Sequence, residues 1–294
     1  MDIAQHLAAT QALIEQGLNG FLPEPVGPAA RLLAAMRYSV QGGKRVRAFI
    51  TIQAAEMFGL TTEAVLPAAV AIEFMHAASL IHDDMPCIDD SPMRRGLPSC
   101  HTQFDQHTAL LAGDALIVRA FELLASVRTS GIDPAAIVRV IGEFAEATGA
   151  MGLIGGEAAD IEAENQPPEA NLLSFIHTNK TAKLIVAAAR TGAILALAED
   201  APLRTLSEYA HHLGLLFQIT DDILDATGTE ARLGKPVGAD RASQKMTYPA
   251  LLGVAGSRQR AQEVARMAIA AAEVLQARND LWVQLVNLLL ERDS

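Results

Sequence analysis

The chain has 294 residues, of which 50% are hydrophobic and 4% aromatic, and its net charge is −11. This composition suits closely packed helices and can fill a sizeable core, while the negative charge argues against nucleic acid as a partner. Cys87 and Cys100 form neither a metal-ligand spacing nor a disulfide framework. The first residues carry no signal-peptide pattern, and no uninterrupted apolar run approaches the ~18 residues of a membrane span. We therefore expect a cytoplasmic protein without a membrane span.

Helical periodicity and helix-ending residues divide the chain into a succession of predicted helices. Glycines close several early helices, and Asp133 followed by Pro134 opens a later one. In chain order, the predicted helices span 3–19, 29–40, 45–57, 62–84, 105–128, 134–151, 172–198 and 200–225, with two or three more over 246–292. Loops are expected at 162–171 and 226–245, and around the Arg94-Arg95-Gly96 sequence.

No segment shows the sustained alternation and β-branched enrichment that would predict a sheet. No repeat of fixed length and no shift of composition marks a second domain. The sequence therefore predicts a single all-α domain over residues 1–294, built from about ten or more helices.

An acidic cluster ends the predicted helix at 62–84 and consists of Asp83, Asp84, Asp89 and Asp90. So many neighbouring carboxylates repel one another and titrate upward unless cations compensate them. Hard divalent ions such as Mg²⁺ prefer carboxylate oxygens. Pro86 interrupts helical hydrogen bonding, so Asp89 and Asp90 are expected on a bend.

A second acidic cluster, Asp221-Asp222-Ile223-Leu224-Asp225, ends another apolar helical run. Asp221 and Asp225 are four residues apart and share a helix face with Gln218. Carboxylates at this end of a helix oppose its macrodipole, a cost that bound cations would relieve. A solvated acidic helix end is the alternative for the motif taken alone. Together, the two clusters suggest two halves of one metal site.

Basic residues lie next to both clusters in this acidic chain. Lys44 and Arg47 begin a helix after a double glycine, a place where an anion could sit between them. His76 is two helical turns before Asp83 on the same predicted face. The remaining cations near the clusters are Arg94, Arg95, Lys180, Lys235 and Lys245. Each alone would be interpreted as a solvated surface charge, and His76 alone as a core residue, so their common placement is the informative feature.

Several motifs in order resemble those of the trans-isoprenyl diphosphate synthases, in particular the bacterial farnesyl and geranylgeranyl type. The resemblance runs collinearly from about residue 30 to 255. The matching segments are GGKRVR at 42–47, HAASLIHDDMPCIDDSPMRRG at 76–96, NKT at 179–181, FQITDDILD at 217–225, LGKPVGAD at 233–240 and KMTYPALLG at 245–253.

The resemblance implies antiparallel helices around a deep central cavity, a homodimer, and three Mg²⁺ ions in each active site. By position, the metal-side carboxylates would be Asp83, Asp84, Asp89, Asp221, Asp222 and Asp225. The allylic diphosphate would meet Arg94, Lys180, Lys235 and Lys245, and isopentenyl diphosphate would meet Lys44, Arg47, His76 and Arg95. Thr181 and Gln218 would lie near the developing carbocation. The reaction itself would depend on Asp83, Asp84, Lys180, Thr181, Gln218 and Asp221.

Product length is expected to depend on the helix that leads into the first cluster. Ala78 lies five residues before Asp83, about 7.5 Å along the axis, where farnesyl-producing members of this type usually carry an aromatic residue. Alanine there leaves room for a C20 product, geranylgeranyl diphosphate, and Met75 and Phe74 would stop further growth. The alternatives are that Ala78 only packs against a neighbouring helix, or that the product is farnesyl diphosphate.

Two positions depart from the family pattern: Ala48 stands where proline is common, and Glu157 stands where glutamine is usual in GGQxxD, with Asp160 retained. Neither is expected to touch the metal ligands. A class I terpene cyclase is a competing interpretation, but its second metal motif normally contains Asn, Ser or Thr and Glu. A non-catalytic partner subunit is another, but such subunits typically have eroded Asp motifs, and both are intact here.

Overall fold

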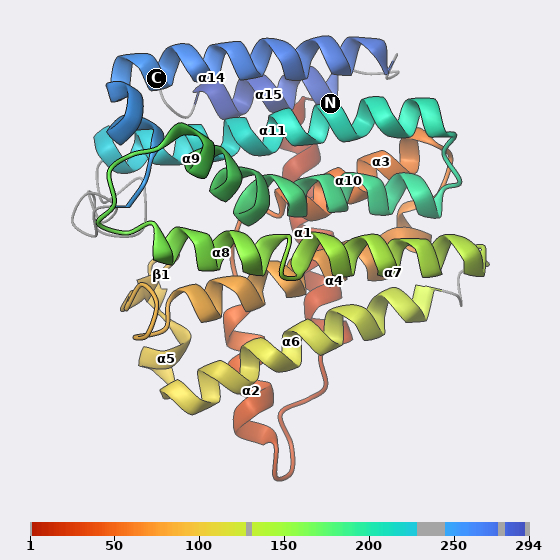
Figure 1. The fold of residues 1–294 in the computed structure, drawn as a ribbon. Coiled ribbons are helices and arrows are strands. Elements are labelled where there is room, and N and C mark those ends of the chain that lie inside the picture. Colours follow the sequence, from red (N-terminus) through yellow and green to blue (C-terminus); the bar gives the residue numbers. More distant parts are fainter. Residues whose placement is uncertain (1, 128–130, 228–244, 276–279, 292–294) are drawn as a thin grey trace.

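The computed structural model describes residues 2–127, 131–227, 245–275 and 280–291. In these ranges the chain is almost entirely helical, and long helices run side by side in a single bundle (Figure 1). The helices are α1 (Ile3–Phe21), α2 (Ala30–Ser39), α3 (Val46–Met57), α4 (Thr62–Asp83), α5 (Cys100–Gln103), α6 (Gln106–Ser126), α7 (Pro134–Thr148), α8 (Leu153–Glu162), α9 (Ala170–Ile176), the π-helix η2 (His177–Ala182), α10 (Lys183–Leu195), α11 (Asp200–Thr227), α14 (Tyr248–Val274) and α15 (Leu281–Glu291).

The predicted all-α class is confirmed, and so are most of the predicted helices, with ends shifted by a few residues. The single helix predicted at 172–198 is wrong, because the chain forms α9, a π-helical turn and α10 there. Helix α8 was not predicted, since Gly155 and Gly156 weaken its helical signal.

The loop predicted around Arg94 is in fact a small antiparallel hairpin, in which β1 (Met93–Arg94) pairs with β2 (Leu97–Pro98). Arg95 and Gly96 form its turn with φ values of 54° and 76°, the positive pair that a tight hairpin turn requires. Strands of two residues are too short to produce a visible alternation, which is why the sequence pattern missed them.

Helix α4 is the central element of the bundle. Thr61 caps it by accepting a hydrogen bond from the backbone N–H of Ala64, and the helix packs against α3, α6 and α10. By length and composition α4 could span a membrane, but 67% of its most apolar window is buried inside the protein. Its apolar character is therefore explained by its place in the core.

A buried ion pair joins the start of α3 to α4. Arg45 precedes α3 in the left-handed conformation, with φ of 53°, and its guanidinium lies 3.3 Å from the Glu73 carboxylate, the two side chains being 1% and 3% exposed. The backbone N–H of Ala48 donates to the other Glu73 oxygen at 3.1 Å. A proline at position 48 could not make this bond, so alanine here adds a hydrogen bond to the buried carboxylate.

Removing one partner should expose the cost of this buried pair. We expect Glu73→Ala to lower the free energy of unfolding by about 3–5 kcal/mol, because it leaves the Arg45 charge buried and uncompensated. Urea denaturation followed by circular dichroism measures the change. Glu24→Ala is the control, since Glu24 is 76% exposed in its pair with Arg37 and should contribute less than about 1 kcal/mol. Equal losses in the two variants would contradict this prediction.

Candidate active site

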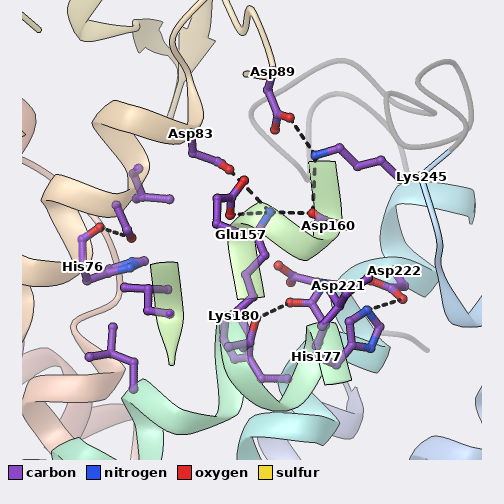
Figure 2. Close-up of a pocket in the computed structure, with 18 of the residues that line it drawn as sticks. His76, Asp83, Asp89, Glu157, Asp160, His177, Lys180, Asp221, Asp222 and Lys245 are labelled. Atoms are coloured by element: carbon purple, nitrogen blue, oxygen red, sulfur yellow. Dashed lines mark hydrogen bonds and ion pairs between the residues drawn. The ribbon is translucent and has the colours of Figure 1, made fainter. Parts of the chain in front are cut away.

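A cavity of about 240 Å³ opens between α4, α8, η2, α11 and the segment that leads into α14 (Figure 2). Both acidic clusters contribute to its wall, so residues far apart in the sequence meet at one end of the bundle. Its polar lining residues are Arg47, His76, Ser79, Asp83, Asp89, Ser91, Arg94, Glu157, Asp160, His177, Lys180, Thr181, Gln218, Asp221, Asp222, Lys245 and Thr247. Leu80, Leu153, Ile176, Leu184, Phe217 and Met246 form the apolar remainder.

Helix α4 delivers the first cluster by simple periodicity. His76, Leu80 and Asp83 lie on one face of the helix and line the cavity, as the spacing predicted. The helix ends at Asp83, and the backbone N–H of Asp89 then donates to the Asp83 carbonyl at 3.0 Å. This tight turn, at the Pro86 predicted to break the helix, returns Asp89 to the cavity, while Asp90 is exposed.

The β1–β2 hairpin places its two arginines on different partners. Arg94 binds both carboxylates of the aspartate pair, at 3.2 Å from Asp83 and in closer contact with Asp84. Arg95 donates to the backbone carbonyls of Gln41 and Gly42 at 2.9 and 3.0 Å. The hairpin thereby ties the acidic cluster to the GGKRVR loop.

The π-helix η2 carries Lys180 and Thr181, and two glycines allow its close packing. A β-carbon at Gly156 of α8 would lie 2.2 Å from the backbone nitrogen of Lys180, and one at Gly214 of α11 would lie 2.6 Å from the Ala182 Cα. Only glycine permits backbones to approach this closely. The widened π-turn is held between α8 and α11, and π-helical turns are frequent at functional sites.

Lys180 is the cation with the most carboxylate partners around the cavity among the described residues. Its ammonium lies 2.7 Å from Asp160, 2.8 Å from Glu157 and 3.5 Å from Asp83. Glu157 also lies beside Asp83, close enough to help lower the pKa of that carboxyl. The expectation that Glu157 would not touch the predicted metal ligands is therefore wrong, because α8 directs this side chain toward Asp83 on α4 (Figure 2).

The second cluster is held by a chain of hydrogen bonds. Thr181 donates to Gln218 at 2.7 Å, and the Gln218 amide donates to Asp222 at 2.8 Å. The other Asp222 oxygen accepts the backbone N–H of Tyr248 at 3.0 Å and lies 3.6 Å from the buried His177 ring. These contacts fix Asp222 between η2, α11 and the start of α14.

Positive charge gathers on the side of the cavity next to α3. The guanidinium of Arg47 lies 3.3 Å from Nε2 of His76, and burial followed by Arg47 lowers the pKa of His76 well below its ordinary value. The neutral ring can accept this hydrogen bond. Burial, and then the charge of Arg45, lowers the pKa of Arg95 to about 10. Such mutual repulsion among arginines is relieved when an anion binds between them.

Around the first acidic cluster, burial instead disfavours the charged form of the carboxylates. Burial raises the pKa of Asp84 above its ordinary value in spite of Arg94, and burial raises the pKa of Glu157 to about 7. Burial would also raise the pKa of Asp83, but Lys180 and Arg94 outweigh it and lower that pKa. Within the part of the chain that the structure describes, the cations thus compensate the first cluster incompletely. An all-oxygen donor set with unrelieved negative charge fits Mg²⁺, although no group of three potential ligands is preassembled among the described residues.

Not every predicted site residue lines this cavity. Lys44 is exposed, and Arg95 and Asp84 border a smaller adjoining pocket. Asp225 is buried beside the wall, Lys235 lies outside the described residues, and the predicted product-length residues Phe74, Met75 and Ala78 are buried in the core without lining the cavity.

Sequence reasoning missed His177, and it noted Glu157 and Asp160 without giving them a site role. His177 is three residues before Lys180, inside a helix predicted as regular. Asp160 and Glu157 stood in a segment with no predicted element. The GGxxxD spacing was the one available signal, since paired glycines mark close backbone approach.

Comparison with known proteins agrees with this geometry. The polyprenyl synthetase family model matches residues 29–281. The chain is 40% identical to the farnesyl diphosphate synthase of Geobacillus stearothermophilus over 88% of both chains. It is 44% identical to the chloroplastic geranylgeranyl pyrophosphate synthase of Catharanthus roseus, over 80% of this chain and 66% of that one.

Among solved structures, a geranyltransferase from Helicobacter pylori complexed with magnesium and isoprenyl diphosphate superimposes with a TM-score of 0.87, at 30% identity over 99% of this chain and 97% of that one. The fold and the two facing acidic motifs define an all-α isoprenoid synthase. The chain belongs to the polyprenyl synthetase family, the trans-isoprenyl diphosphate synthases, and is a prenyltransferase.

Because His177 is buried, we expect it to make the stability of the protein sensitive to acid. Burial lowers its pKa from the ordinary 6.5 to about 4, so between these values the unfolded chain binds a proton that the folded protein does not. Stability from this residue is therefore complete above about pH 6.5 and is lost as the pH falls toward 4, by about 3 kcal/mol. Denaturant titrations in EDTA at several pH values should show that His177→Gln loses less stability than the wild type across this window. Parallel pH profiles would contradict the assignment.

Proposed function

We propose that the protein condenses isopentenyl diphosphate with allylic diphosphates of C5 to C15 to form all-trans geranylgeranyl diphosphate, releasing diphosphate. The observation that carries the C20 assignment is the pair of small side chains, Ala78 and Ser79, just before the first acidic motif. Ser79 lines the cavity, and Ala78 is fully buried behind it. A larger side chain at either position would shorten the space available to a growing chain.

Farnesyl diphosphate is the second candidate product. Relatives of similar identity include farnesyl diphosphate synthases from Geobacillus stearothermophilus and Escherichia coli as well as plant geranylgeranyl synthases. Overall identity therefore favours neither product, and the C20 assignment depends on the side chains just before the first acidic motif.

The carboxylates Asp83, Asp84, Asp89, Asp221, Asp222 and Asp225 would hold Mg²⁺, three ions by family resemblance. When bound, the ions would supply charge stabilisation for the departing diphosphate. Arg94, Lys180 and Lys245, which line the cavity, would bind the remaining diphosphate oxygens, with Lys235 added by resemblance. Arg47 and His76, joined by Lys44 and Arg95, would hold isopentenyl diphosphate.

The reaction breaks the allylic C–O bond, and the isopentenyl double bond then attacks the resulting cation. Apolar wall residues, among them Phe217 and Leu184, exclude water that would otherwise trap the cation. The Thr181 and Gln218 oxygens would lie beside the cation, as the resemblance implies. The proton lost from the isopentenyl unit goes to the released diphosphate, so the chemistry needs no protein nucleophile.

Two other interpretations make different predictions for the same assay. A terpene cyclase would consume an allylic diphosphate without isopentenyl diphosphate, and a non-catalytic subunit would elongate none. Incubation with Mg²⁺, isopentenyl diphosphate and primers of C5, C10 and C15, followed by product sizing, separates these cases. The homodimer belongs to the proposal on the strength of the resemblance, and the cytoplasmic location expected from the sequence belongs to it as well.

Removal of one metal-side carboxylate should abolish most of the activity. We expect Asp84→Asn to lower kcat by about 100-fold or more. The Mg²⁺ ions that would stabilise the leaving diphosphate lose one of their carboxylate ligands in this variant. Asp90→Asn is a matched control from the same cluster, since the Asp90 side chain is 74% exposed and has no assigned ligand role. EDTA should silence the wild type and added Mg²⁺ should restore it. An equal decrease of kcat in both variants would contradict the assignment of Asp84 as a metal ligand.

The product-length assignment is tested on Ala78 and its neighbour. We expect Ala78→Tyr to shift the main product from C20 to C15, and Ser79→Phe to do the same from the cavity wall itself. Radio-TLC of the dephosphorylated products measures the change. Ala158→Tyr, on the exposed face of α8, should leave product length unaltered. A C20 product from both folded variants, or a C15 product from the wild type, would overturn the assignment.

A further inference from the structure

The cations proposed to bind the allylic diphosphate already hold carboxylates of the protein. Arg94 binds Asp83 and Asp84, and the Lys245 ammonium lies 2.7 Å from Asp89. Lys180 binds three carboxylates. An arriving diphosphate therefore has to replace the protein's own anions on these side chains.

The partners of Lys180 are of two kinds. Asp83 is a metal-side residue, so a bound divalent cation would draw its charge away from the ammonium. Glu157 and Asp160, at 2.8 and 2.7 Å from the Lys180 ammonium, are not among the proposed ligands and would keep their own positions when a metal binds. The Lys180 side chain is 22% exposed, so these pairs are screened only partly by solvent.

Glu157 is the unusual member of this group. The resembling family usually has glutamine at this place, and a glutamine amide would offer Lys180 a neutral oxygen in place of a charge. Gly156, directly before it, packs against the Lys180 backbone, so position 157 cannot withdraw without moving η2. Above the pKa of about 7 of Glu157, this extra negative charge acts on the Lys180 ammonium from 2.8 Å.

We propose that Glu157 is a positioning residue that holds the Lys180 ammonium among the carboxylates and so makes diphosphate binding strongly dependent on Mg²⁺. Without metal, the ammonium is shared by Asp83, Glu157 and Asp160 and is less available to the diphosphate. With metal on Asp83, one of the three partners is withdrawn and the side chain can move to the ligand. The proposal depends on the diphosphate site described under the proposed function, and not on the C20 product.

The test is the binding of geranyl S-thiolodiphosphate, whose C–S bond resists ionisation and whose C10 chain favours the allylic site. Isothermal titration calorimetry at about pH 8.5, above the pKa of about 7 of Glu157, gives the ratio of the Kd values in EDTA and in saturating Mg²⁺ for each protein. We expect Glu157→Gln to tighten metal-free binding by about tenfold and to change binding with Mg²⁺ by less than about twofold. The ratio of metal-free to metal-bound Kd should therefore fall.

Two controls separate this role from a general effect of charge. Glu157→Asp keeps the carboxylate and should keep a ratio near that of the wild type. Glu143→Gln removes a carboxylate that lies 2.6 Å from Arg190, outside the cavity lining, and should leave the ratio unchanged. Circular dichroism confirms that each variant is folded.

The proposal is overturned if Glu157→Gln tightens binding by the same factor with and without Mg²⁺, since that is a bulk charge effect. It is also overturned if the variant weakens metal-free binding, because Glu157 would then orient Lys180 toward the ligand. A C15 product from the wild type would refute the proposed product and leave this ratio intact, so the two failures are distinguishable.

Discussion

The constraint on which this site depends is the crowding of carboxylates where α4 ends. Asp83 and Asp84 lie at the carbonyl end of a long helix, where the macrodipole disfavours negative charge, and α8 adds Glu157 and Asp160 from the facing side. Arg94, Lys180 and Lys245 compensate only in part, as the raised pKa of the buried Asp84 carboxyl indicates. The fold therefore holds a negative field that favours divalent cations and, once they are bound, an anion.

Backbone packing keeps these charges in register. The π-helix η2 lies against Gly156 on one side and Gly214 on the other, which sets Lys180 toward α4 and Thr181 toward Gln218 on α11. The hydrogen bonds from Thr181 through Gln218 to Asp222 continue this alignment to the second motif. A side chain at either glycine would push apart helices whose charges compensate one another. The ion pairs of the site therefore depend on the close packing of these backbones.

The parts of this arrangement that were predictable have a periodic or compositional signal. Helix α4 could be predicted because its apolar run is long, and His76 and Asp83 could be placed on one face because seven residues are nearly two turns. The π-helical turn η2 could not be predicted, because it differs from an α-helix by about one extra residue per turn and leaves the local helix preference of the sequence unchanged. The role of Glu157 was also hidden, since its contact with Asp83 is set by how α8 packs on η2 and not by any neighbouring residue in the chain.

Product length shows the same limit at a finer scale. Ala78 is four residues before His82, so the two share a face of α4. His82 packs on Gly113 of α6, where an added β-carbon would lie 2.1 Å from its ring. Ala78 thus faces the α4–α6 contact, while Ser79, one residue on, reaches the cavity. A large side chain at position 78 must therefore either displace α6 or turn past Ser79 into the cavity. A close-packed core resists displacement, so we expect the side chain to turn into the cavity. Ala78 can therefore affect product length although it does not line the cavity wall.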